Sequence, residues 1–168
     1  MNLSARYASN SSILKVCANY IDLIDQNDNI IRFVNGRVES TISGINNDIQ
    51  KVFVYDNLNR LVRIYDPRKF NLNTHLSDGS SRFIDFYYNE DGLLSSVYNG
   101  IDRINYEYNG DLLVNVYQSR ENYKKNLYHF SYDSNNRLEC IYEYSENKGY
   151  YFAYYDNSNL VEGLDSRF

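Results

Sequence analysis

Acidic and aromatic residues alternate in one short stretch of the second half of the chain. Glu139, Glu143 and Glu146 lie close together there, with Tyr142 and Tyr144 between them. Clustered carboxylates attract a basic partner, and tyrosine supplies a large contact area together with a hydroxyl that can stay wet. A solvated strand face is the plainer interpretation of the same residues. Two further acidic residues flank a neighbouring turn, and the predicted partner-binding residues are Glu139, Tyr142, Glu143, Tyr144, Glu146, Glu107 and Asp111.

Charge is unevenly distributed along the chain. Residues 1–84 contain 10 basic and 8 acidic residues, whereas residues 85–168 contain 7 basic and 14 acidic ones, and the net charge of the whole chain is −5. An acidic surface repels nucleic acid and attracts a basic protein. The sequence therefore predicts a basic protein partner and no nucleic-acid ligand.

Signatures of catalysis, of phosphate binding and of metal binding are absent from the sequence. It has no G-x-S-x-G, no HExxH, no P-loop and no G-x-G-x-x-G. The aspartates at positions 22, 25 and 28 lack the glycine and closing glutamate of a calcium loop. We therefore expect no enzyme activity, no metal site and no cofactor.

The cysteines and histidines are too few and too scattered to form a site. Cys17 and Cys140 make neither a CxxC pair nor a disulfide framework, and each lies within an apolar, strand-like run, where buried free thiols are usual. His75 and His129 are remote from one another in sequence. Because His129 alternates with aromatic residues, we expect it on the surface of a strand.

Length and patterning indicate one domain that spans residues 1–168. No apolar run approaches the ~20 residues that a membrane span needs. The N-terminal residues lack the basic, apolar and small-residue segments of a signal peptide. We therefore expect a cytoplasmic protein that does not bind membranes; its oligomeric state is left open by the sequence.

A short phrase recurs about six times between residues 20 and 165: an aromatic-rich run, then Tyr-Asp or a variant, a polar turn and an aliphatic pair. The clearest copies begin at Tyr55, Tyr88, Tyr132 and Tyr155, and looser copies begin at Ile24 and Tyr108. Strand-forming residues on both sides of a short Asn-, Asp- and Gly-rich loop are the signal of a β-hairpin. The aspartate that follows the tyrosine is expected to close the turn through its side chain.

Alternation within the copies predicts the two faces of the sheet. Tyr128, Phe130 and Tyr132 share one face by period two, and His129 and Ser131 share the other. Likewise, residues 104, 106 and 108 should face away from residues 105 and 107.

Single hairpins cannot bury an apolar face, so neighbouring copies must join. We expect an all-β fold, an antiparallel meander in one twisted sheet that is open, curled into a sandwich or partly closed as a barrel. Short helices are considered at residues 69–81 and 119–126.

The copies resemble the YD repeats of the Rhs and teneurin families, whose phrase is Tyr-Asp, two variable residues, Gly, Arg, Leu. Arg60 and Arg137 stand at the arginine position, whereas Leu93 and Leu160 replace it. Three of the four clear copies have asparagine where the phrase has glycine. The resemblance implies a β-hairpin meander. It does not imply a toxin-enclosing shell, because about six copies are too few to enclose a cargo domain.

Two classes of function fit these residues. The first is an immunity protein of bacterial competition, which binds and neutralises a basic toxin of a contact-dependent or Rhs-type system. Its support is the acidic, tyrosine-rich second half and the lack of catalytic signatures. The second is a structural or carbohydrate-binding repeat module of a secreted or cell-surface protein, in which tyrosines stack on sugar rings.

Overall fold

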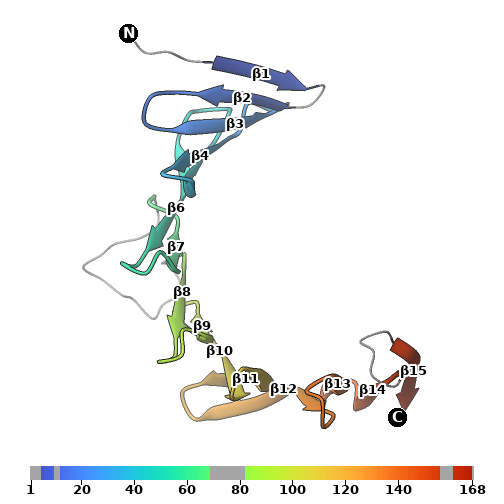
Figure 1. Cartoon of the computed structure of the whole chain (residues 1–168). Coiled ribbons are helices and arrows are strands. Elements are labelled where there is room, and N and C mark those ends of the chain that lie inside the picture. The colour runs from blue at the N-terminus through green and yellow to red at the C-terminus, as the bar shows by residue number, and fades with distance from the viewer. Residues whose placement is uncertain (1–4, 10–11, 69–81, 156–160, 168) are drawn as a thin grey trace. The chain divides into compact units, whose positions relative to one another are not determined.

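The fold is that of a computed structural model, which describes residues 5–9, 12–68, 82–155 and 161–167, with side chains for 12–68 and 82–155. The described residues form fifteen β-strands and no helix (Figure 1). The strands are β1 (Ala5–Ser9), β2 (Ser12–Val16), β3 (Ile21–Asp25), β4 (Ile30–Val34), β5 (Arg37–Ile42), β6 (Ile49–Tyr55), β7 (Leu61–Tyr65), β8 (Phe83–Tyr88), β9 (Leu94–Tyr98), β10 (Arg103–Asn109), β11 (Leu112–Arg120), β12 (Tyr123–Tyr132), β13 (Leu138–Glu143), β14 (Lys148–Tyr154) and β15 (Val161–Arg167).

Each strand lies beside the next one in chain order, in a single antiparallel meander (Figure 1). Among the described strands, β1 and β15 are not paired with each other, so the sheet is not closed into a barrel. This confirms the prediction of an all-β antiparallel meander in one sheet. The chain divides into two compact units, residues 1–85 and residues 86–168, which are described separately below.

Aspartate side chains close the repeated turns, as the sequence predicts. Asp56 Oδ1 accepts hydrogen bonds from the backbone N–H groups of Leu58 and Arg60, and its Oδ2 accepts one from Arg60 Nε. Asp133 closes the turn before Arg137 in the same way. The backbone N–H of the arginine is the main reason that the pKa of each carboxyl lies below its usual value, and the bond from the arginine side chain lowers it further. Through its Nε bond to the aspartate, the arginine side chain of the phrase has a structural role in the turn.

The copy at Ile24 has the same turn with a different partner. Asp25 accepts hydrogen bonds from the backbone N–H groups of Asn27 and Asn29 and from the Asn29 amide, which takes the place of the arginine. Because turns alternate between the two ends of a meander, this turn lies at the opposite end of its unit from the turn closed by Asp56. The shared phrase therefore encodes the geometry of a turn. It does not determine at which end of the unit that turn lies.

Left-handed backbone accounts for the asparagines at the glycine position of the phrase. Asn59 and Asn136 have φ values of 66° and 59°, and Gly92 has a φ of 83° at the equivalent place. Asparagine and glycine are the residues that adopt this region at least cost.

Substitution at this position should separate the effect of backbone conformation from that of side-chain loss. We expect Asn136→Ala to destabilise the protein by about 1 kcal/mol, because alanine is strained at positive φ, and Asn136→Gly to be nearly neutral. Chemical denaturation measures both variants, with the exposed neighbour change Asn135→Ala as the control. Equal stability of the alanine and glycine variants at position 136 would contradict the interpretation.

Beta-bulges lie opposite the tyrosine of the phrase, in the strand that follows the turn. The register shifts between Val54 and Tyr55, between Glu107 and Tyr108, and between Ser131 and Tyr132. In each pairing the extra residue lies on the later strand, at position 62, 114 or 139, and the strand that carries the tyrosine is unbroken there. Tyr132 therefore shares a face with Tyr128 and Phe130, as predicted, and residues 104, 106 and 108 likewise share one face.

Each of these tyrosines spans to the strand that precedes it. Tyr55 donates its hydroxyl hydrogen bond to the carbonyl of Val38 (2.9 Å), Tyr108 to Leu94 (2.9 Å), Tyr132 to Leu113 (2.8 Å) and Tyr154 to Leu138 (2.7 Å). The equivalent residue in the last copy is thus Tyr154, and not the Tyr155 that the sequence pattern indicates. These four bonds form a tyrosine ladder, which ties each hairpin to the one before it.

The predicted helix at residues 119–126 is wrong. These residues are the end of β11, a two-residue turn and the start of β12, with Arg120 directly opposite Tyr123. Glu121 in the turn has a φ of 46°, which an α-helix does not permit. The other helix considered, at residues 69–81, lies outside the described residues, as does His75.

Few apolar side chains are buried in the described part of the chain. Those that are buried number four: Ile42, Phe83, Val116 and Cys140. Polar side chains are buried beside them, above all Asp22, which is 2 % exposed and pairs with Arg32 directly opposite on the next strand. Arg63 and Asp85 make a second directly opposed pair across β7 and β8. In a two-layer domain, buried positions of this kind are filled by an apolar core. In this sheet, directly opposed polar pairs fill some of them and contribute to stability.

Candidate binding surface

Four of the predicted partner-binding residues lie together at the β13–β14 hairpin. Tyr142 and Glu143 end β13, and Tyr144 and Glu146 lie in the turn that follows. The rings of Tyr142 and Tyr144 pack edge to face with their centroids 5.0 Å apart. Tyr144 is 43 % exposed and Glu146 is exposed as well, so the tip of this hairpin combines an aromatic ring with negative charge at the surface.

A fifth predicted residue, Glu107, lies on the same face of the sheet as Tyr142, in one row across four neighbouring strands. Successive members of the row are directly opposed in register, from Glu107 on β10 through Asn115 and His129 to Tyr142 on β13. Three strand spacings separate the ends of the row, a distance of about 14 Å. We call Glu107, Asn115, His129 and Tyr142 the polar row.

Hydrogen bonds along the polar row have a defined direction. The Asn115 amide nitrogen donates to Glu107 Oε2 (3.0 Å), because a carboxylate can only accept. The Asn115 amide oxygen therefore faces His129 Nδ1, which lies 2.8 Å away and must donate its proton. His129 is exposed, as the sequence predicts, and its Nδ1–H orients the amide that positions the carboxylate.

Lys124 and Tyr117 lie beside the polar row. Lys124 Nζ is 3.7 Å from the centroid of the Tyr117 ring and 3.8 Å from Glu107 Oε1. These contacts are on the surface, since 57 % of the Lys124 side chain and 45 % of the Glu107 side chain are exposed. The carboxylate of Glu107 is thus shared between an amide donor of the row and an ammonium group.

The remaining two predicted residues are not brought to this surface. Glu139 is the extra residue of the bulge near the start of β13, where it is not paired with a residue of β12. It is about 17 Å from Tyr144 along the strand. Asp111 is exposed in the β10–β11 turn, at the same end of the unit as Glu139 and the opposite end from Tyr144. The seven predicted residues therefore do not form one surface.

Three members of this surface were missed by sequence reasoning: Asn115, Tyr117 and Lys124. Their positions depend on the register of β10, β11 and β12, and this register shifts at three bulges between Glu107 and Tyr142. Alternation within one strand cannot locate such shifts. The sequence gives one indication of this surface: by alternation, Asn105 and Glu107 share a polar face of their strand, opposite the face of residues 104 and 106.

The unit that holds the polar row is the acidic one. Residues 86–168 contain 7 basic and 13 acidic residues, a net charge of −6, whereas residues 1–85 have a net charge of +1. A surface of this sign raises the rate of encounter with a basic partner and lowers it for nucleic acid.

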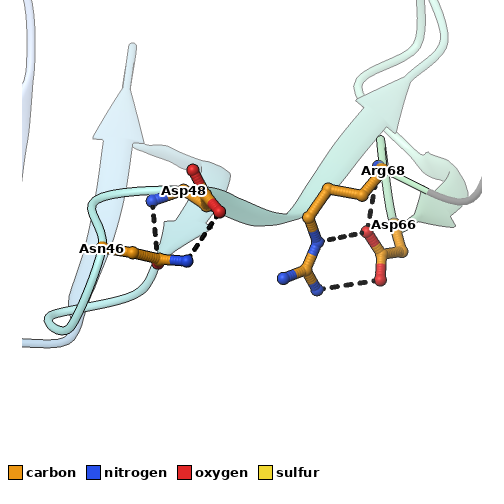
Figure 2. Close-up of polar contacts among 4 residues, drawn as sticks. All are labelled: Asn46, Asp48, Asp66 and Arg68. Atoms are coloured by element: carbon orange, nitrogen blue, oxygen red, sulfur yellow. Dashed lines mark hydrogen bonds and ion pairs between the residues drawn. The ribbon is translucent and has the colours of Figure 1, made fainter.

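Polar groups at the end of the first unit are engaged with one another. Asn46 and Asp48 bond within one turn, and Asp66 accepts two bonds from the Arg68 guanidinium and one from its backbone N–H (Figure 2). The Asp66 bonds are the main reason that the pKa of Arg68 is raised, and the nearby Asp48 carboxylate adds to the effect. These contacts order two loops and leave no reactive group that is set up for chemistry.

A shallow cleft of about 150 Å³ lies in the first unit, lined by residues of β4, β5 and β6. Its Tyr55 belongs to the tyrosine ladder through the hydroxyl bond to Val38, and the Arg37 guanidinium lies 5.5 Å from the centroid of the Tyr55 ring. Side-chain clusters that could hold a metal ion are absent from residues 12–68 and 82–155.

The cysteines differ in burial. Cys140 is 9 % exposed on β13, as predicted for a buried free thiol, whereas Cys17 is half-buried in the turn after β2.

Comparison with protein-family models finds no family that matches this chain, and comparison with curated proteins finds no relative. Within the described residues there is no helix with the length and apolar character needed to cross a membrane.

Proposed function

We propose that this chain is a cytoplasmic immunity protein, which binds a basic bacterial toxin of a contact-dependent or Rhs-type system and neutralises it without catalysis. The observation that supports this function best is the polar row with its neighbouring hairpin tip. It offers an exposed carboxylate at Glu107, an exposed ring at Tyr144 packed on the half-buried ring of Tyr142, and an acidic surround. Aromatic anchors within a complementary charge field are typical of tight, rapidly formed protein interfaces.

Protection in cells tests the proposal directly. Any toxin domain encoded beside this chain is expressed from a tightly controlled promoter, with and without the chain, and colony survival is counted. We expect survival only when the chain is present, together with a stoichiometric complex in size-exclusion chromatography. Death in both cultures and the absence of a complex would sink the proposal.

Removing negative charge from the hairpin tip should slow association with the toxin. The variant Glu143→Gln with Glu146→Lys is expected to lower the association rate constant about tenfold at low salt and to weaken its salt dependence, because steering depends on charge near the contact. Surface plasmon resonance at several ionic strengths measures both effects. A matched control, Glu90→Lys with Asp91→Asn, makes the same net charge change at exposed positions of the β8–β9 turn. Equal slowing by both variants would place the contact elsewhere.

A carbohydrate-binding or structural module of a secreted or cell-surface protein is the second candidate. One observation favours it: Asn115, His129 and Tyr142 are directly opposed on neighbouring strands, and sugars are held by polar side chains next to aromatic rings. A glycan array with the purified chain distinguishes the two. Saturable binding to one glycan that is lost in Tyr142→Ala would favour this candidate over the immunity protein.

A further inference from the structure

Lys124 occupies a site whose chemistry is that of a cation receptor. The ammonium lies over the face of Tyr117, where the ring quadrupole attracts positive charge, and beside the Glu107 carboxylate. An aromatic face together with a carboxylate accepts either the ammonium of lysine or the guanidinium of arginine, and the planar guanidinium can in addition bond a carboxylate in a bidentate manner.

The receptor groups are positioned independently of Lys124. Asn115 holds one oxygen of Glu107 through its amide, and His129 holds Asn115, so the carboxylate is oriented by the polar row. Tyr117 lies on β11 between paired strands on either side, directly opposite Asn105 and Asn126. Loss of the Lys124 side chain should therefore leave the ring and the carboxylate in place.

Lys124 itself is weakly held. More than half of its side chain is exposed, and its nitrogen is 3.8 Å from the nearest carboxylate oxygen, longer than a good charged hydrogen bond. Exposed pairs of this kind contribute little to stability, because water screens the charges and ordering a long side chain costs entropy. A cation with additional contacts can therefore displace it.

We infer that Tyr117 and Glu107 form a recognition site for a lysine or arginine side chain of the protein partner, and that Lys124 fills this site from within the chain until the partner displaces it. The inference rests on the proposed function in one respect, namely that the partner is a basic protein. It adds which group of the partner is recognised, where it binds, and why the free protein does not leave the site open to other cations.

A small probe tests the site without the toxin. N-acetyl-arginine methylamide is titrated into the full chain while the NMR signals of the Tyr117 ring and the Asn115 side-chain amide are followed. The citrulline analogue, which is neutral and nearly the same shape, controls for contacts that do not depend on charge. We expect Lys124→Ala to bind the arginine probe at least about fivefold more tightly than the unmodified chain, and the citrulline probe to produce no matching shift.

Matched variants make the outcome decisive. Lys125→Ala removes the same charge from the next residue, which is also exposed but alternates to the other face, and it should not change probe binding. Adding Glu107→Gln or Tyr117→Leu to Lys124→Ala should remove the gain. Equal effects of the changes at positions 124 and 125, or shifts that persist without Glu107, would overturn the inference. Denaturation midpoints confirm that each variant is folded.

The probe and the toxin also separate the two proposals. If the probe binds as expected and no toxin complex forms, the site stands and the immunity function fails. If the toxin complex forms and is insensitive to Glu107→Gln and Tyr117→Leu, the function stands and this site is not the contact.

Discussion

Replacing Tyr132 with phenylalanine should destabilise the protein by about 1 kcal/mol, and replacing it with alanine by about 3 kcal/mol. The first change removes the hydrogen bond from the hydroxyl to the Leu113 carbonyl, which is 2.8 Å long and partly buried. The second also removes the ring that covers the neighbouring strand. Burial raises the pKa of this tyrosine, in agreement with a hydroxyl that is withdrawn from water.

Urea unfolding followed by far-UV circular dichroism measures both losses. Tyr123→Phe is the matched control, because Tyr123 lies at the other end of the same strand and is 56 % exposed, so this change should cost less than about 0.5 kcal/mol. If Tyr132→Phe and Tyr123→Phe are equally stable, the tyrosine ladder contributes nothing and the repeated tyrosine needs another explanation.

Sequence reasoning predicts the turns of this protein well, because their chemistry is local. An aspartate that accepts from the next backbone N–H groups, and an asparagine or glycine at positive φ three residues after it, can be recognised within five residues of sequence. Asp56, Asp133 and Asp25 all bond in this way. The strands on both sides then follow from their β-branched and aromatic composition.

The faces of the strands are predicted less well, because alternation assumes an unbroken ladder. A bulge opposite each tyrosine of the phrase adds one residue to the strand after the turn, at position 62, 114 or 139, so counting along that strand misassigns the faces beyond it. The tyrosine itself keeps the face that counting assigns. Its hydroxyl also links two hairpins, which alternation does not predict.

The candidate site depends on register, which is not written in any one strand. Glu107 and Tyr142 are 35 positions apart and lie in one row only because three strand pairings with three bulges align them. Glu139 is much nearer to Tyr142 in sequence but lies in a bulge near the other end of β13, outside the row. Proximity in sequence therefore identified the hairpin tip at Tyr144 and Glu146, and it could not identify Asn115, Tyr117 or Lys124.

The buried ion pair was also beyond sequence reasoning, and it has the second largest expected effect on stability. Arg32 donates two hydrogen bonds to Asp22, and the Asp22 side chain is 3 % exposed whereas that of Arg32 is 29 % exposed. The guanidinium also lies 4.1 Å from the Tyr20 ring centroid. Removing one partner of a buried pair leaves the other charge without compensation, so the cost depends on which charge remains buried.

We therefore expect an asymmetric result from the two single substitutions. Arg32→Ala should destabilise the protein by about 3 kcal/mol, because it leaves a carboxylate that water hardly reaches. Asp22→Ala should cost about 1 kcal/mol, because the remaining guanidinium is more exposed and can regain water. Lys124→Ala, which breaks a surface pair with Glu107, should be nearly neutral. Urea midpoints at pH 7 measure all three variants under the same conditions.

A second substitution at position 22 shows whether the buried charge is the cause. On the Arg32→Ala background, Asp22→Asn keeps the shape of the side chain and removes its charge, so about half of the lost stability should return. If Asp22→Asn makes the Arg32→Ala variant less stable, the cost of losing Arg32 arises from its packing on Tyr20 instead. Recovery would show that the buried Asp22 carboxylate is stable in this sheet only because Arg32 lies directly opposite it. The need to keep these two residues opposed would then help to fix the register of β3 and β4.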